Sequence, residues 1–327
     1  DGTSAGTVLV KDIWSGSNYS SPDYLTNVNG TLFFRAYDGV NGFELWKSDG
    51  TSAGTIMVRD IFSGINSSSP YFLTNLNGTL FFRANNGTNG VELWKSDGTS
   101  AGTVLVRDIV PGSLSSGIGY PTNVNGTLFF SADNQSTNGP ELWKSDGTVL
   151  VKDIWIGNSS NPNRLTDVNG TLFFRADNGT NGEELWKSDG TSAGTVLVKD
   201  INPGTSSSEP NYLININGTL FFRAYDGVNG YELWKSDGTS AGTVLVKDIW
   251  SGSNYSSPDY LTNVNGTLFF RAYDGVNGFE LWKSDGTSAG TIMVRDIFSG
   301  INSSNPHFLT NVNGTLFFAA DDGTNGI

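Results

Sequence analysis

The stretch FELWKSDGTSAGT, residues 43–55, decides the fold, because its core ELWKSDG recurs throughout the chain. A second marker, the tripeptide NGT, recurs at intervals of 48 residues with one interval of 44, which divides the chain into seven units. A period of this length is typical of propellers and solenoids. The ELWKSDG copies open at Glu44, Glu92, Glu141, Glu184, Glu232 and Glu280, and the NGT copies at Asn29, Asn77, Asn125, Asn169, Asn217, Asn265 and Asn313.

Each unit is expected to contain four strands, which in the first unit are residues 23–28, 31–37, 43–48 and 55–61. Asn29-Gly30 is the preferred pair for a two-residue type I′ hairpin turn, and DGVNG (38–42) supplies Gly and Asn for positive φ. The short unit lacks four residues after Asp146-Gly147, which a loop tolerates and a strand does not. Asp146-Gly147 should therefore join its third and fourth strands directly.

Four antiparallel strands, three hairpins and a longer crossover describe a propeller blade. We therefore predict an all-β fold, a β-propeller of about seven four-stranded antiparallel blades that together form a single repeat domain, 1–327. A β-solenoid array is one alternative. A five-bladed ring followed by extra units is another, because residues 1–68 and 237–304 are identical. The expected blades are approximately 22–61, 70–109, 118–154, 162–201, 210–249, 258–297, and 306–327 completed by 1–13.

The last blade is the incomplete one in this scheme. Residues 7–13 would be its outer strand and residues 307–312 and 315–320 its inner strands, so its third strand would be absent. An unpaired strand edge of this kind favours association with another chain. Because the chain starts inside a repeat, we also expect its natural N-terminus to lie upstream.

Composition excludes several classes of function. A net charge of −13 and a pI near 4.4 argue against binding to nucleic acid and to anionic membrane surfaces. No run of about 18 apolar residues exists, so no membrane insertion is expected. The absence of cysteine excludes disulfides, thiolate metal sites and a cysteine nucleophile.

The repeated phrase ELWKSDGT resembles the ELWxxDGT repeat, a family of bacterial modules found in large, secreted, repetitive proteins. All seven units fit the pattern, although the last ends before ELW, and the resemblance covers essentially the whole chain. It implies a propeller-type module outside the cell or on its surface. It implies no reaction, because no catalytic residues carry over from the family to this sequence.

The tryptophans of ELW are the first candidate binding residues. They could stack on sugars, as in propeller lectins, but their place in the middle of a strand favours packing between blades. A second group follows the fourth strand, where other units carry Phe62 or Phe298. We expect these to be partly exposed, and if any aromatic side chain contacts a ligand, this is the group in which the contact is expected. The first group is Trp46, Trp94, Trp143, Trp186, Trp234 and Trp282, and the second is Trp14, Trp155 and Trp250.

The loops 37–44 and 177–184 alternate Asp, Asn and Glu with Gly, as calcium loops do. The EF-hand spacing is not met, Asn86 replaces the first acid in one unit, and a tight turn needs these residue types in any case. We therefore predict no cofactor, with calcium as the alternative.

The aspartate of each KSDGT is interpreted as a turn residue that could also meet the lysine two positions earlier. Arg35 and Glu44 lie on facing strands of one hairpin and could form a cross-strand pair, although Ser131 and Ala319 replace the arginine in two units. The aspartates are Asp49, Asp97, Asp146, Asp189, Asp237 and Asp285.

His307 is the only histidine. One histidine without cysteine cannot form a three-ligand zinc site, and no G-x-S-x-G nucleophile motif accompanies it. We interpret it as a surface residue. The NGT tripeptides are interpreted as turns, and they would act as glycosylation sites only in a eukaryotic secretory host.

These patterns predict a protein that is not an enzyme, with no catalytic, cofactor or metal residues and with ligand-binding residues unknown. It would be an extracellular or cell-surface scaffold, or a multivalent adhesion domain. Its partners would be other protein chains, neighbouring copies of the same array, or surface glycans. Lectin-like glycan binding at blade interfaces and glycoside hydrolysis by carboxylates near the central channel are the alternatives. The residues that depart from the repeat form no acid–base pair; they are Gln135, Arg164, Glu183, Glu209 and His307.

Overall fold

Every regular element of the chain is a β-strand. A computed structural model describes residues 2–135, 139–146 and 148–326, and none of these residues lies in a helix. No helix among them could therefore cross a membrane. The chain divides into two compact units, residues 1–150 and 151–327, each of which is described by itself.

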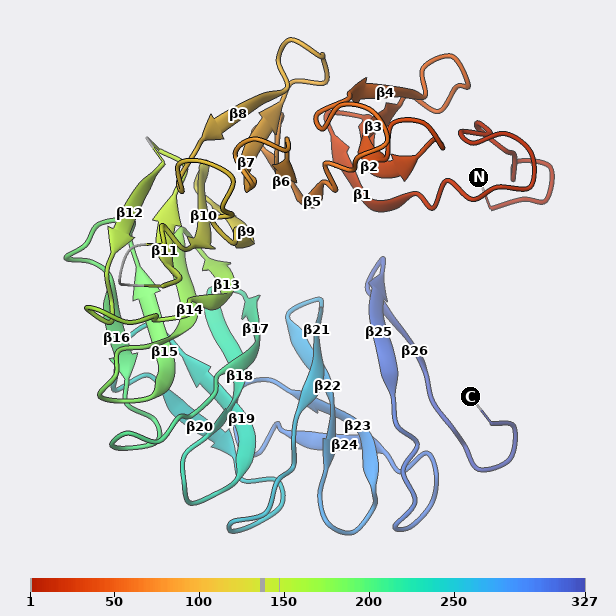
Figure 1. Cartoon of the computed structure of the whole chain (residues 1–327). Helices are drawn as coiled ribbons and strands as arrows, with labels where there is room; N and C mark the ends of the chain where they lie inside the picture. Colours follow the sequence, from red (N-terminus) through yellow and green to blue (C-terminus); the bar gives the residue numbers. More distant parts are fainter. Residues whose placement is uncertain (1, 136–138, 147, 327) are drawn as a thin grey trace. The chain divides into compact units, whose positions relative to one another are not determined.

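The first unit contains three four-stranded sheets, drawn from red to yellow-green in Figure 1, and in each sheet every strand pairs with the next strand of the sequence. The last strand, β12, lies at the boundary between the units. The strands are β1 (Asp23–Val28), β2 (Thr31–Tyr37), β3 (Phe43–Ser48), β4 (Ile56–Arg59), β5 (Tyr71–Leu76), β6 (Thr79–Asn85), β7 (Val91–Ser96), β8 (Val104–Arg107), β9 (Gly119–Val124), β10 (Thr127–Ala132), β11 (Glu141–Lys144) and β12 (Val149–Lys152).

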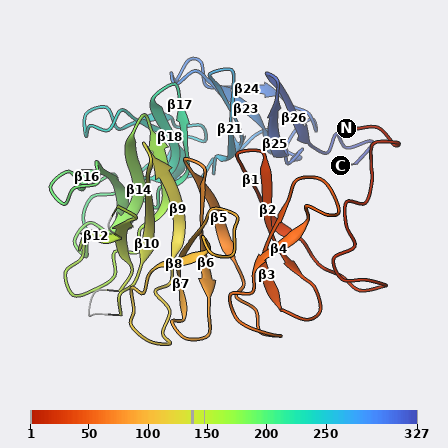
Figure 2. The same cartoon turned by 90° about the horizontal axis from the view of Figure 1, so that it is seen from above.

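The second unit contains three further four-stranded sheets and a two-stranded one. Figures 1 and 2 both show the two-stranded hairpin standing beside β21. The strands are β13 (Asn163–Val168), β14 (Thr171–Asp177), β15 (Glu183–Ser188), β16 (Val196–Lys199), β17 (Asn211–Ile216), β18 (Thr219–Tyr225), β19 (Tyr231–Ser236), β20 (Val244–Lys247), β21 (Asp259–Val264), β22 (Thr267–Tyr273), β23 (Phe279–Ser284), β24 (Ile292–Arg295), β25 (His307–Val312) and β26 (Thr315–Ala319).

The strand prediction is confirmed for the first three strands of the first unit, whereas the fourth is shorter than expected, at Ile56–Arg59. The NGT turns are also confirmed, since Asn29 and Gly30 both have positive φ, at 51° and 83°. In the short unit Gly147 lies outside the described residues. The N–H of Thr148 donates to the carbonyl of Ser145 over 3.1 Å, and the Asp146-Gly147 turn itself stays a prediction.

Neighbouring sheets pack face to face, which explains why the second strands are apolar on both sides. In the first unit, Val28, Phe33 and Leu45 of the first sheet pack against Leu80 and Phe82 of the second. The innermost strands follow one another in each unit: β1 lies beside β5 and β5 beside β9, while β13, β17, β21 and β25 form the second series. Burial of both faces supplies most of the hydrophobic stabilisation.

Each innermost strand contains a β-bulge that the sequence analysis did not anticipate. In β1, Asp23 pairs with Arg35 and Thr26 with Phe33, so Tyr24 and its neighbour lie opposite one residue of β2. The bulged residue is left-handed in every repeat, a conformation that is rare for bulky side chains. These residues are Tyr24, Phe72, Tyr120, Arg164, Tyr212, Tyr260 and Phe308, with φ between 52° and 57°.

A second left-handed residue stands three positions earlier and directly before a proline in six repeats. Ser21 before Pro22 has φ of 43°. In the third repeat glycine takes this place: Gly117 has φ of 61° and no proline follows it. The conformation is therefore a property of the fold and does not depend on one residue type.

The last sheet consists of β25 and β26 alone, and residues 7–13 are not part of a strand. Completion of this blade by residues 1–13 stays a prediction. Part of its surface is open, since Val312 and Phe317 are 48% and 57% exposed.

Glycine positions give the first test of this packing. A Cβ added at Gly278 (φ +77°) would lie 2.0 Å from the carbonyl oxygen of Asn302, whereas one added at Gly252 (φ +85°) would meet nothing within 4 Å. Gly278→Ala should cost about 2–4 kcal/mol of stability, because it adds a backbone clash to the φ strain. Gly252→Ala should cost only about 1 kcal/mol. Thermal unfolding midpoints would check this, and equal shifts for the two variants would contradict it.

Candidate functional site

The six tryptophans of ELW are packing residues, as predicted. Each is only 4% to 6% exposed, and Trp94, for example, packs with Val58, Ile61 and Phe82 between two sheets. Their indole Nε1 atoms are buried, and no acceptor for them exists among the described residues. They cannot serve as open platforms for sugars.

The other group of tryptophans is partly exposed, again as predicted. Trp14 meets Tyr37 edge to face, with ring centroids 4.8 Å apart, and its ring covers Gly39, where a Cβ would approach within 2.4 Å of the indole nitrogen. Trp155 covers Gly179 in the same way. A ligand contact at these residues stays a prediction.

The aspartates of KSDGT are turn residues. Asp49 Oδ1 accepts hydrogen bonds from the N–H of Thr51 over 2.9 Å and from its hydroxyl over 2.7 Å, and these bonds lower the pKa of Asp49. The lysine two positions earlier does something else: Lys47 Nζ donates to the carbonyl of Gly98 in the next sheet over 2.8 Å. Lys144 alone lies near its aspartate among the described residues, at 3.7 Å from Asp146.

The loops that resemble calcium loops are closed by their own hydrogen bonds. Asp38 Oδ1 accepts from the N–H groups of Val40 and Asn41, and Oδ2 accepts from Asn41 Nδ2 over 2.7 Å. In another repeat Asn86 takes the place of this aspartate and accepts the same backbone bonds. In the described ranges no group of three or more metal-ligating side chains comes together.

His307 and the other residues that depart from the repeat are dispersed. His307 Nδ1 lies 2.9 Å from the carbonyl of Asn305, and its ring packs against Phe308. Glu209 accepts a bond from the Tyr231 hydroxyl, and Glu183 pairs with Arg175. Each contact is local to its own sheet and the adjoining loop.

The glutamate of ELW has a role that the sequence analysis missed. Glu44 is fully buried. It accepts hydrogen bonds from the N–H of Ile61 over 3.0 Å, from the N–H of Ser68 over 2.8 Å and from the Ser68 hydroxyl over 2.6 Å. Ile61 and Ser68 lie at the two ends of the crossover that leads to the next sheet. The glutamate therefore ties each sheet to the chain segment that begins its neighbour.

This glutamate staple recurs along the chain. In the last complete sheet, Glu280 accepts from the N–H of Ile297, the N–H of Ser304 and the Ser304 hydroxyl. Burial dominates over these hydrogen bonds and raises the pKa of the carboxyl to about 7 in four repeats. Those four are Glu44, Glu92, Glu184 and Glu232.

The cross-strand pair that the sequence suggested between Arg35 and Glu44 does not form. Arg35 lies opposite Leu45 in the register, and Glu44 opposite Ala36. Arg35 instead binds Asp23 through two parallel hydrogen bonds, Nε to Oδ1 over 2.8 Å and Nη2 to Oδ2 over 2.6 Å. Counting back from the Asn29-Gly30 turn without a bulge places Tyr24 opposite Arg35. The bulge in β1 shifts the register by one residue, so that Asp23 lies there instead.

Arginine and aromatic side chains form a surface along the innermost strands, which we call the aromatic belt. Arg35 lies over the rings of Tyr24 and Tyr71, at 5.0 Å and 4.4 Å from their centroids, and these rings are 4.5 Å apart. Arg83 covers Tyr71 and Phe72 in the same manner. The bulge rings of the complete sheets are 37% to 44% exposed, and Phe308 in the two-stranded sheet is 73% exposed.

The second unit has a belt of the same construction, in which Arg223 lies over Tyr212 and Arg271 over Tyr260. Such cation–π stacking holds the rings in place without covering them. An exposed aromatic face beside guanidinium and carboxylate groups can stack on a flat apolar face and bind hydroxyl groups. The belt is therefore the surface of the described chain best suited to a ligand.

Comparison with known proteins supports the fold. No family model matches the sequence, and no curated protein matches it. A prolyl endopeptidase, solved in a study of two such enzymes and the role of inter-domain dynamics in catalysis and specificity, superimposes with a TM-score of 0.53. It is 11% identical over 91% of this chain and 45% of its own length.

Oligopeptidase B from Leishmania major gives a TM-score of 0.48 at 11% identity, over 92% of this chain and 44% of the other. This chain thus spans less than half the length of either solved protein. The likeness to the prolyl endopeptidase, together with the sheet pattern, confirms an all-β, β-propeller fold in place of a β-solenoid.

The buried glutamates predict how stability depends on pH. A carboxyl whose pKa is raised in the folded state contributes stability below its unfolded pKa, and this contribution is lost as pH rises through about 7. Each such site is worth on the order of 1–3 kcal/mol. The thermal midpoint should therefore fall between pH 5 and pH 8, and Glu232→Gln should make that fall smaller. Calorimetry across this range is the measurement, and an unchanged slope in the variant would refute the assignment.

Proposed function

We propose that this chain is a non-catalytic repeat module that acts outside the cell or on its surface, as a scaffold or a multivalent adhesion domain. One observation carries the proposal. The charged side chains that recur in the repeat are engaged in bonds that hold a sheet together or join it to its neighbour. Glu44 accepts a hydrogen bond from the N–H of Ser68 in the crossover, and Asp49 accepts one that closes its turn. Lys47 donates to a backbone carbonyl of the next repeat.

An active site needs a few residues that differ from their surroundings and converge on one pocket. The residues that differ here, such as Gln135, Glu209 and His307, are separated along the chain and bind local partners. The raised pKa of the glutamates does not point to catalysis, because the same burial and the same donors accompany it in several repeats. The placement outside the cell is supported by the resemblance to the ELWxxDGT repeats.

Near-identical repeats present near-identical surfaces, which suits weak binding at many points at once. The partners we propose are other protein chains, neighbouring copies of the same array, and surface glycans. An excess of negative charge keeps such an array soluble.

Lectin-like glycan binding is the second candidate, and the aromatic belt favours it. Tyr24, Tyr120, Tyr212 and Tyr260 are each between 40% and 44% exposed, and arginines hold two of them in fixed orientation in the second unit. The place proposed for the glycan therefore moves from the tryptophans of ELW, which are buried, to the tyrosines of the innermost strands.

The scaffold proposal predicts no turnover. Chromogenic glycosides and peptide substrates incubated with the chain should release product at the rate of buffer alone. Product release that a single carboxylate substitution abolishes would overturn the proposal.

The glycan candidate predicts binding that depends on the belt. On a glycan array, Tyr212→Ala and Tyr260→Ala together should weaken retention at least about tenfold, because they remove two stacking faces from a multivalent surface. Tyr19→Ala is the matched control, since Tyr19 is 82% exposed but lies outside the belt. Silence of the whole array would refute glycan binding and leave the scaffold role. An equal loss in the control would refute the belt as the binding surface.

A further inference from the structure

Five repeats carry an arginine at the same position of the second strand, and four of these arginines bind an acceptor within the protein. Arg223 is the fifth, and among the described residues it has no hydrogen-bond acceptor and no ion-pair partner. Its Nε atom is buried without an acceptor. The four others are Arg35, Arg83, Arg175 and Arg271, bound by Asp23, the carbonyl of Ile118, Glu183 and Asp259 in that order.

An asparagine in place of an aspartate explains why Arg223 has no partner. Asn211 pairs with Arg223 in the register as Asp259 pairs with Arg271. Asp259 accepts from Arg271 Nε over 2.8 Å and from Nη2 over 2.5 Å. Asn211 Oδ1 accepts instead from the N–H of Tyr212 over 2.9 Å. The edge of the guanidinium that a carboxylate binds in the next repeat is therefore vacant here.

Tyrosines surround this guanidinium and hold it in place. Arg223 lies over the rings of Tyr212 and Tyr231, at 4.9 Å and 5.1 Å from their centroids. Tyr255, from the following crossover, packs against Tyr231 with ring centroids 5.5 Å apart. Tyr212 and Tyr255 are 40% and 49% exposed, and Arg223 is itself partly exposed. A fixed cation thus lies beside aromatic faces that solvent reaches.

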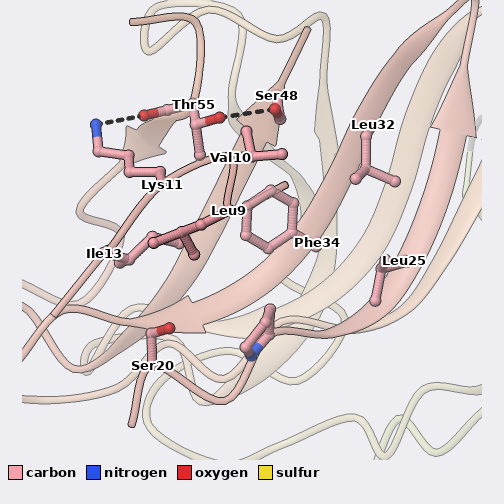
Figure 3. A pocket seen from close by; sticks show the side chains of 11 residues that line it. Leu9, Val10, Lys11, Ile13, Ser20, Leu25, Leu32, Phe34, Ser48 and Thr55 are labelled. Carbon is pink, nitrogen blue, oxygen red and sulfur yellow. Dashed lines mark hydrogen bonds between the residues drawn. The ribbon is translucent and has the colours of Figure 1, made fainter. Parts of the chain in front are cut away.

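Other cations of the repeats donate to backbone carbonyl groups. Lys11 Nζ donates to the carbonyl of Thr55 over 2.7 Å, beside an apolar cavity that Leu9 and Leu25 line (Figure 3). Lys235 Nζ donates to the carbonyl of Gly286 over 2.8 Å. Arg223 differs from them because its donors have no acceptor in the described part of the chain.

We propose that Arg223 binds the carboxylate of an acidic sugar, a hexuronic acid residue of a glycan. The carboxylate lies along the guanidinium edge, as Asp259 does beside Arg271, because the two planar groups match in a two-pronged hydrogen bond. The exposed ring of Tyr212 offers a face for the apolar side of the sugar ring. This inference rests on the glycan candidate among the proposed functions and names the class of sugar.

The charge of the chain limits which acidic glycans fit. A net charge of −13 repels a dense polyanion along its length, whereas a single carboxylate needs only one local cation. Glu209 is the acidic neighbour, and its Oε2 accepts from the Tyr231 hydroxyl over 2.8 Å. Its negative charge opposes a bound carboxylate and would favour a sugar hydroxyl. We therefore expect a glycan with isolated uronic acid residues, and Glu209 can distinguish the two kinds of ligand group.

Binding is tested by titrating the whole chain with methyl β-glucuronide and following the arginine Nε–H signals by NMR. The Arg223 signal, assigned with Arg223→Lys, should shift and saturate in the millimolar range. The Arg271 signal should stay in place, because Asp259 occupies its edge. The methyl ester of the same sugar keeps the ring and loses the charge, so it should bind at least about tenfold more weakly.

Exchanging residues between the two equivalent repeats tests the same contact. Asn211→Asp supplies an internal carboxylate, so it should weaken binding at least about tenfold without lowering the thermal midpoint. Asp259→Asn should make the Arg271 signal respond to the sugar. Circular dichroism confirms that each variant is folded.

Two further variants separate a specific contact from a general effect of charge. Asn163→Asp is the matched control, since Asn163 lies opposite Arg175, which Glu183 already binds; it should leave binding at Arg223 unchanged. Glu209→Gln removes a like charge and should strengthen glucuronide binding about twofold.

Three results would overturn the inference. One is an Arg223 signal that the glucuronide does not move. Another is an ester that binds as tightly as the acid, or binding that Glu209→Gln weakens, since either indicates a neutral sugar. The third is equal binding of N-acetylglutamate amide, which would assign the site to acidic peptides. Array binding that depends on Tyr212 and Tyr260, with no response at Arg223, would refute this inference alone and leave the glycan candidate standing.

Discussion

The buried glutamate of ELW fixes the position of each sheet relative to the next sheet along the chain. Each sheet is apolar on both faces, so it is stable only between neighbours, and the chain must deliver the next sheet in the right place. The glutamate of ELW does this by binding both ends of the crossover, as Glu184 does with Ile201 and Ser208. Because three donors converge on one carboxyl, the crossover has little freedom. The packing of Leu220 and Phe222 against the sheet before them follows from that constraint.

Local chemistry explains how much of the fold the sequence predicted. The strands, the Asn-Gly turns and the burial of the tryptophans follow from residue patterns within one unit, and they are confirmed. The bulge at Tyr24 and the partners of Arg35 and Glu44 depend on register between strands and on the crossover. A pattern of residue types does not contain that information. The glutamate that precedes Leu-Trp in each copy nevertheless indicated a buried hydrogen-bonded group, because a charged residue beside a buried core needs a partner.

The candidate site was harder to predict than the fold. The exposed tyrosines of the innermost strands occupy positions that read as ordinary strand residues, and only their left-handed backbone turns them outward. Tryptophan often binds ligands, yet the tryptophans of ELW are buried between sheets. In a chain of near-identical units, a residue that recurs in every unit serves the architecture first. Binding surfaces are found where a recurring residue remains exposed.

The paired left-handed residues at Ser21 and Tyr24, and at their counterparts, have a consequence for how such a chain evolves. Nearly identical strands could in principle pair out of register, shifted by one or more residues along the partner. The kink that these residues impose fits only one position on the partner strand, so it fixes the register of every copy. Duplication of a gene segment can then lengthen the array without register errors inside the new units, which is consistent with the unchanged sequence shared by residues 1–68 and 237–304.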